Sequence, residues 1–137
     1  MKKIRVVIGT NDGEKISPCH MGEAENFKIY DIYDNGNSDF IDNRKNTSPD
    51  LNGKHGAIEK MKVVMSIIKD ADVVVGRKMS PNFLRISSNS SLQPVVVKYD
   101  SFSIIIDTII KSFDEIFSLV ERRRSGEKSL NIPVLKD

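Results

Sequence analysis

The residues best suited to metal chemistry lie in one short segment near the start of the chain. Residues 17–27 have the sequence SPCHMGEAENF and hold the only cysteine, Cys19, directly followed by His20. The second of the two histidines, His55, lies in the sequence GKHGA. Thiolate and imidazole groups are ligands for iron, copper and zinc. Three interpretations are open: a metal site, a reactive thiol, or ordinary packing and hydrogen bonding.

The candidate ligands are too few for a closed metal site. A structural zinc site uses four protein ligands, and a conventional [4Fe–4S] site uses four cysteines. Cys19, His20 and His55 are only three candidates within one chain. A metal site here must therefore be incomplete, shared between subunits, or formed by a cluster that brings most of its own ligands.

A β-hairpin is expected soon after this segment. Residues 27–33, FKIYDIY, are rich in aromatic and β-branched residues, and Asn35-Gly36 is a strong hairpin turn signal. The second strand of the hairpin has only Phe40 and Ile41 as strong strand formers.

Three apolar runs are typical of strands buried inside a parallel sheet. They are KIRVVIG at residues 3–9, ADVVVG at residues 71–76 and QPVVVKY at residues 93–99. Because helical patterns separate the last two runs from what precedes them, the order indicates βα units that follow the hairpin.

Helices are predicted from apolar spacing and from capping residues. An apolar face recurs at three- and four-residue intervals from Ala57 to about Lys69, and a second recurs along one long helix from Ile104 to Arg124. Between these two helices, Ser80 and the proline that follows it favour the start of a short third helix. On the long helix, the side chains expected to pack on the sheet are Ile106, Ile109, Ile110, Phe113 and Phe117.

These elements predict one α/β domain over residues 1–128, with a mixed sheet of about five strands and helices on its faces. Residues 129–137 are expected to form a loose C-terminal tail. Ligand sites in such sheets lie at the carboxyl ends of the parallel strands. Cys19, His20 and His55 could converge there although they are far apart in sequence.

Composition excludes several classes of protein. The 137 residues carry a formal net charge of +2, too small by itself to indicate binding to nucleic acid or to a membrane. The basic run Arg122–Arg124 suits the end of a helix better than a nucleic-acid footprint. The apolar run at the start is too short for a signal peptide, and no window is long enough to span a bilayer. With a single cysteine, the pattern indicates a cytoplasmic protein.

Four segments of the chain resemble, in order, the motifs of one known family. The first, SPCHMGEAENFKIYDI, resembles that family's HFG-x-A-x-x-F-x-I-Y segment, and KHGA resembles its HGA element. The third, ADVVVGRKMSPNF, is similar to its strand and GGIGPNA loop. The fourth, DSFSIIIDTII with RSGEK downstream, is similar to its closing helix. Together they resemble the dinitrogenase iron–molybdenum cofactor biosynthesis (accessory) family, and the resemblance runs from Lys3 to about Lys128.

The resemblance implies a three-layer ribonuclease H-like fold with helices on both faces of the sheet. It also implies a non-enzymatic carrier for an iron–molybdenum or iron–sulfur type metallocofactor or its precursor. His20 matches the histidine of the HFG motif and His55 that of the HGA element, whereas Cys19 is particular to this sequence. Metal ligation is thereby expected from Cys19, His20 and His55, and a metallocluster donor or acceptor protein is the implied partner.

The chain departs from the family pattern at the glycine-rich loop, which here is Gly76-Arg77-Lys78-Met79. Where the family's glycines would let backbone N–H groups approach a ligand closely, Arg77 and Lys78 would instead offer side-chain positive charge. Lys54 would add a further positive charge beside a helix N-terminus. The alternative interpretation of these cations is a solvated loop.

Other functions remain open alternatives. A small protein-interaction module could keep the fold and lack the cofactor, and a homodimer could share a metal site that a monomer leaves open. A metal-dependent nuclease needs several carboxylates, because Mg²⁺ prefers oxygen ligands. The first predicted strand has none in its interior, and Asp12 lies beyond its end. We therefore expect no nuclease or phosphatase activity, and no membrane or nucleic-acid partner.

Overall fold

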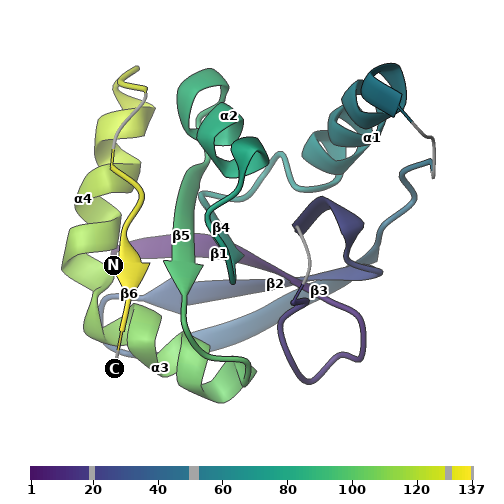
Figure 1. Cartoon of the computed structure of the whole chain (residues 1–137). Coiled ribbons are helices and arrows are strands. Elements are labelled where there is room, and N and C mark those ends of the chain that lie inside the picture. The colour runs from purple at the N-terminus through teal and green to yellow at the C-terminus, as the bar shows by residue number, and fades with distance from the viewer. Residues whose placement is uncertain (19–20, 50–52, 129–130, 137) are drawn as a thin grey trace.

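The computed structural model describes residues 1–18, 21–49, 53–128 and 131–136, and for residues 53–57 the backbone alone. Within this part of the chain the strands form one six-stranded mixed sheet in the order β3-β2-β1-β4-β5-β6 (Figure 1). The strands are β1 (Lys3–Thr10), β2 (Asn26–Tyr33), β3 (Ser38–Lys45), β4 (Val73–Gly76), β5 (Gln93–Val97) and β6 (Val134–Leu135).

The strand directions agree with the predicted mixed sheet. β1, β4 and β5 are parallel neighbours, while β2 runs antiparallel to both β1 and β3. The predicted hairpin turn is confirmed, since Gly36 has a φ of 88° and its N–H donates to the Tyr33 carbonyl at 3.1 Å. A positive φ at this position favours glycine because it has no Cβ.

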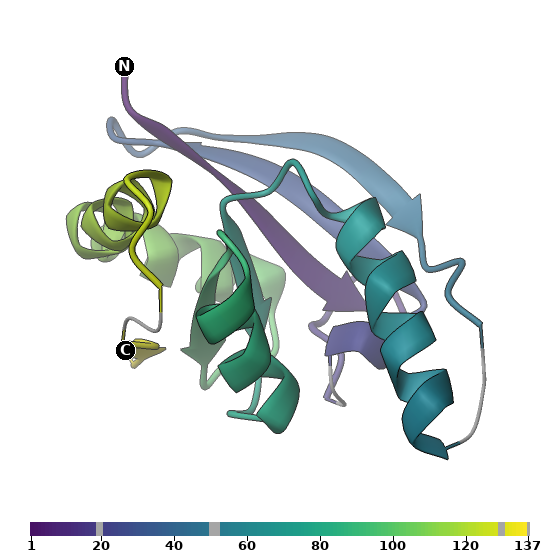
Figure 2. The same cartoon turned by 90° about the horizontal axis from the view of Figure 1, so that it is seen from above.

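Helices cover both faces of the sheet, which gives the three predicted layers (Figure 2). They are η1 (Met21–Glu23), α1 (Gly53–Ile67), α2 (Pro81–Asn89), α3 (Phe102–Lys111) and α4 (Phe113–Arg124). The predicted cap of α2 is confirmed, because Ser80 Oγ accepts from the Phe83 N–H at 3.2 Å. This architecture is consistent with a ribonuclease H-like α/β fold.

Successive side chains of the central strands point to opposite faces of the sheet, so the core has two layers. Val6 and Ile8 of β1 face α3 and α4, whereas Val7 faces α1 and α2. On the first side the buried helix residues are Phe102, Ile105, Ile109, Phe113, Ile116 and Val120. On the second side they are Val64, Phe83 and Ile86, and Ile68, directly after α1, is buried with them. Burial of this apolar surface is the main favourable term in folding.

The single helix predicted from Ile104 to Arg124 is wrong in one respect, because the chain bends at Ser112 and forms α3 and α4 at an angle (Figure 1). The N–H of Ser112 donates to the carbonyls of Thr108 and Ile109, which ends α3. The predicted packing is confirmed: Ile109 and Phe113 are buried, and the partly buried side chains against this layer include Ile106, Ile110 and Phe117. The apolar period continues through the bend, so it did not reveal the break.

Residues 134–135, which fall within the expected C-terminal tail, form β6 and pair in parallel with β5. Leu135 is buried in the α3–α4 layer. Gln93 Nε2 donates to the Asn131 carbonyl at 3.1 Å, which holds the segment that enters β6. A sequence with one proline and little pattern gave no sign of this pairing. No helix in the described residues is long and apolar enough to cross a membrane.

Candidate functional site

A pocket of about 260 Å³ opens at the carboxyl end of β1, where sites in α/β sheets are expected. Its wall comes from the loop that follows β1 and from Asp100, in the loop between β5 and α3. The lining residues are Asn11, Asp12, Lys15, Ile16, Ser17, Pro18 and Asp100. Among the described residues, the lining reaches Pro18, the residue directly before Cys19 and His20 in the chain.

Side-chain capping gives the loop after β1 its shape. Thr10, which is fully buried, donates from Oγ1 to the Lys15 carbonyl at 2.6 Å and accepts from the Gly13 N–H at 2.9 Å. Asp12 Oδ1 accepts from the N–H groups of Glu14 and Lys15, both at 2.9 Å. These backbone hydrogen bonds lower the pKa of the Asp12 carboxyl group, because they favour its charged form. Asp12 thus acts as a loop cap in this structure.

The chain on both sides of Cys19 and His20 is anchored to the sheet. Before them, the Ser17 N–H donates to the Gly9 carbonyl at 2.8 Å, and the Ile16 N–H donates to the Asp100 carbonyl at 2.9 Å. After them, Met21 and Ala24 are buried in the α1–α2 layer. Ala24 packs so closely on Gly9 that a Cβ there would lie 2.8 Å from the Ala24 Cβ.

The strand directions bring the start of α1 to the end of the sheet where the pocket lies. The chain leaves β3 at the end of the sheet where β1 also ends, and it enters β4 at the opposite end. α1 therefore begins on the pocket side (Figure 2). Asn46, directly after β3, donates from Nδ2 to the carbonyls of Gly22 and Ala24 at 2.9 and 2.8 Å. The segments that lead to α1 and away from His20 are therefore joined by hydrogen bonds.

The side chains of the predicted ligands lie outside the described part of the chain. Cys19 and His20 lie outside the described residues, and Lys54 and His55 lie in the first turn of α1, where only the backbone is described. Their convergence on one ligand remains a prediction. Within the described residues, no group of three or more His, Cys, Asp or Glu side chains could hold a metal ion.

The two predicted cations after β4 differ in their surroundings. Arg77 donates from Nε to Asp100 Oδ1 at 2.8 Å and from Nη1 to the Val97 carbonyl at 3.1 Å. Lys78 is exposed, and its side chain pairs with no carboxylate of the described residues. Asp100, which sequence reasoning missed, connects the pocket wall to Arg77. Its only signal was its place in the loop between β5 and α3.

The glycine that precedes these cations is required by packing. A Cβ on Gly76 would lie 2.4 Å from the Phe83 Cζ, closer than real Cβ contacts allow. The absence of a side chain therefore lets α2 pack against the end of β4. This first glycine of the loop has a structural role, while the following positions carry charge.

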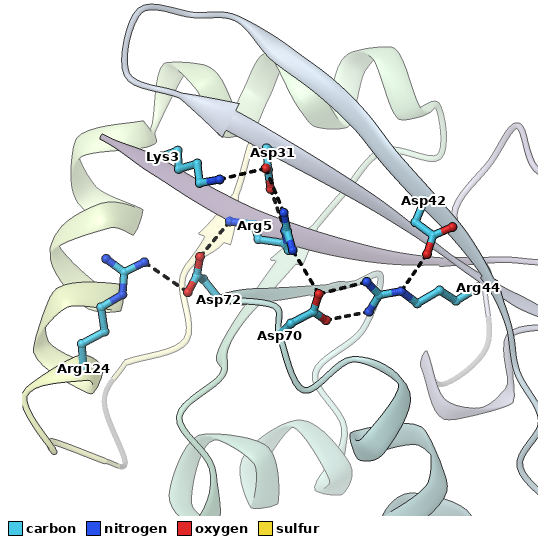
Figure 3. Close-up of polar contacts among 8 residues, drawn as sticks. All are labelled: Lys3, Arg5, Asp31, Asp42, Arg44, Asp70, Asp72 and Arg124. Carbon is cyan, nitrogen blue, oxygen red and sulfur yellow. Dashed lines mark hydrogen bonds and ion pairs between the residues drawn. The ribbon is translucent and has the colours of Figure 1, made fainter. Parts of the chain in front are cut away.

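A second group of charged residues surrounds the connection between α1 and β4 (Figure 3). Arg5 makes two hydrogen bonds to the Asp31 carboxylate, at 2.8 and 3.1 Å, and a third to Asp70 at 3.0 Å. Arg44 makes two hydrogen bonds to Asp70, at 2.6 and 2.9 Å, and one to Asp42 at 3.1 Å. The pKa of Asp70 is lowered mainly by its hydrogen bonds to Arg44. We call this group the Arg5–Arg44 network.

Comparison with known proteins gives one match. Residues 2–112 match the family model described as dinitrogenase iron-molybdenum cofactor, which is more than half of the chain. No curated protein and no solved structure matches the sequence. The chain therefore belongs to the dinitrogenase iron–molybdenum cofactor family, as the four segments indicated.

Proposed function

We propose that this member of the dinitrogenase iron–molybdenum cofactor family is a non-enzymatic carrier for an iron–molybdenum or iron–sulfur type metallocofactor or its precursor. The observation that carries the proposal is the family match over residues 2–112. A pocket whose lining includes Pro18, the residue directly before Cys19 and His20 in the chain, supports it. The cargo is a substrate that is taken up and passed on, so the partner is a metallocluster donor or acceptor protein. We place the protein in the cytoplasm, where such transfers occur under reducing conditions.

The sparse ligand set suits a carrier. Four protein ligands would close a metal site and oppose release, whereas one to three ligands leave positions open for exchange. His20 is the first candidate because it matches the family's histidine, Cys19 would add a soft ligand, and His55 would add a second imidazole. Lys54, Arg77 and Lys78 would offset the negative charge of a cluster, which the N-terminus of α1 also favours.

Anaerobic uptake of isolated cofactor by the full chain tests the proposal. We expect the wild type to take up cofactor, measured by its visible absorption and by metal and sulfide analysis after gel filtration. His20→Ala should lower the uptake strongly and Cys19→Ala less. Arg122→Gln is a matched surface control, because Arg122 forms an exposed ion pair with Glu127 far along α4. A folded wild type without uptake would contradict the carrier function.

A protein-interaction module of the same fold is the second candidate, favoured by a groove between α1 and α2. The groove, of about 220 Å³, contains Met61, Met65 and Ile86 among its lining residues. On the same two helices, Ile58 of α1 and Leu84 of α2 are 45% and 55% exposed. Adaptable methionines and exposed aliphatic side chains are features of binding surfaces.

A homodimer would bring together two copies of Cys19 and four histidines, enough for a shared site. Sedimentation with and without cofactor tests this. A monomer under both conditions would leave the open site of a single chain.

A further inference from the structure

The ends of three neighbouring strands meet at Asp100. Its backbone carbonyl accepts from the Ile16 N–H in the loop after β1, and its carboxylate accepts from Arg77 directly after β4. Asp100 itself follows β5 and lines the pocket. An isolated bridge between Lys15 and Ser101 adds a second connection to the loop. The main chain of Asp100 is therefore fixed, while its side chain contributes negative charge to the pocket wall.

The Arg77 guanidinium is held in place yet keeps donors for a ligand. The Val97 carbonyl and Asp100 use two of its N–H groups, at 3.1 and 2.8 Å. A guanidinium has about five N–H donors in a fixed plane, so about three remain. The Arg77 side chain is 27% exposed, and it reaches the pocket through Asp100, the lining residue that it contacts. The Val97 contact would hold the guanidinium in place even without Asp100.

The Asp100 carboxylate, by contrast, can leave the pair at little cost. Its side chain is 60% exposed, and its contact with Arg77 is a single hydrogen bond. Exposed ion pairs with one such contact contribute little to stability, since water solvates both charges when they separate. A dianion binds a guanidinium more strongly than one exposed carboxylate does, because it carries twice the charge.

We propose that Arg77 and Asp100 select the ligand of the pocket by its charge, through exchange of the Asp100 carboxylate for an anionic ligand. In the free protein Asp100 neutralises Arg77. When a dianionic ligand enters, it takes the guanidinium donors and the carboxylate turns to solvent. An uncharged ligand cannot replace the carboxylate as the counter-charge of Arg77, and a cationic ligand is repelled by the guanidinium. For the identity of the natural ligand, this inference rests on the proposed carrier function.

A double-mutant cycle on the full chain tests the exchange. The variants are Arg77→Gln, Asp100→Asn and the double variant, and the probes are a synthetic dianionic [4Fe–4S] thiolate cluster and inorganic sulfate, both under anaerobic conditions. Arg77→Gln should weaken binding of both probes about fivefold, and Asp100→Asn should strengthen it by a similar factor. In the double variant the Asn substitution should change affinity less than about twofold, because the competition has been removed.

Arg122→Gln and Glu127→Gln are the matched controls, because they disrupt an exposed ion pair of similar geometry, 2.7 Å from Arg122 Nε to Glu127 Oε2. Thermal unfolding establishes that each variant is folded. Weaker binding in Asp100→Asn would overturn the exchange, since Asp100 would then position Arg77 for the ligand. Unchanged affinities in both single variants, or a wild type that binds neither probe, would overturn it as well. Binding of sulfate with the expected cycle but no cluster uptake would support the exchange and contradict the carrier function.

Discussion

The Arg5–Arg44 network and the pocket edge both contain arginines and aspartates, but they use them differently. In the network each arginine makes paired hydrogen bonds to one carboxylate and a further bond to another, and the Asp31 side chain is only 3% exposed. At the pocket edge, Arg77 and Asp100 share one hydrogen bond. Paired, partly buried contacts fix structure, whereas a single exposed contact leaves charge free for a ligand. The difference predicts that the first region controls stability and the second controls binding.

The largest effect is expected from the network. Arg5→Ala removes both hydrogen bonds to the buried Asp31 carboxylate and leaves Lys3, at 3.2 Å, as its remaining cation. The free energy of unfolding should fall by about 3 kcal/mol, because a buried charge loses its main partner. Urea denaturation measures this change. A loss below about 0.5 kcal/mol, the range expected for a surface substitution, would show that the network is not structural.

Gly76→Ala should also be destabilising, although it changes no charge. The added methyl group would overlap the Phe83 ring, and overpacking of this kind costs about 2 kcal/mol. The same urea experiment measures it. Gly22→Ala is a suitable control, since no atom of the described part of the chain lies within 4 Å of a Cβ built on that glycine. Equal stability of the two variants would contradict the close packing between β4 and α2.

The network should also make stability depend on pH below neutrality. Hydrogen bonds from Arg44 lower the pKa of Asp70 in the folded protein relative to its ordinary value near 4. The stabilisation is therefore complete above the unfolded pKa and is lost as the pH falls through the folded pKa. Asp70→Asn should lower stability near pH 7 and flatten the acid limb of the stability curve. An acid limb as steep as that of the wild type would rule out this contribution of Asp70.

The fold was largely predictable from local signals, because its elements follow from short-range patterns. Buried β-branched runs, the glycine of the hairpin turn and the serine cap of α2 each act within a few residues. The bend at Ser112 was missed because the apolar period continues through it. β6 was missed because two residues carry too little pattern to predict a strand.

The side-chain contacts were less predictable, because they join residues far apart in the chain. The basic run near the end of α4 shows this. Arg123 is 3% exposed and donates to Gln93 Oε1 at 2.7 Å and to the Ser87 carbonyl at 2.8 Å, so it is part of the interior. Arg124 pairs with Asp72 at 3.2 Å. The sequence favoured a structural role for the run at the end of a helix, but nothing in it indicated which arginine is buried. For the same reason Asp100 was missed as the partner of Arg77.

The smallest effect on stability is expected at the pocket edge, and it separates the two regions most directly. Arg77→Gln removes one exposed ion pair, so the free energy of unfolding should change by less than about 0.5 kcal/mol. The glutamine amide can still donate to a carbonyl or a carboxylate, which preserves part of the contact without the charge. A variant that keeps full stability while its affinity for sulfate falls would establish that Arg77 serves binding. If Arg77→Gln instead destabilised the protein as much as Arg5→Ala does, the guanidinium would belong to the structural framework. The contrast between the two regions would then be one of position alone.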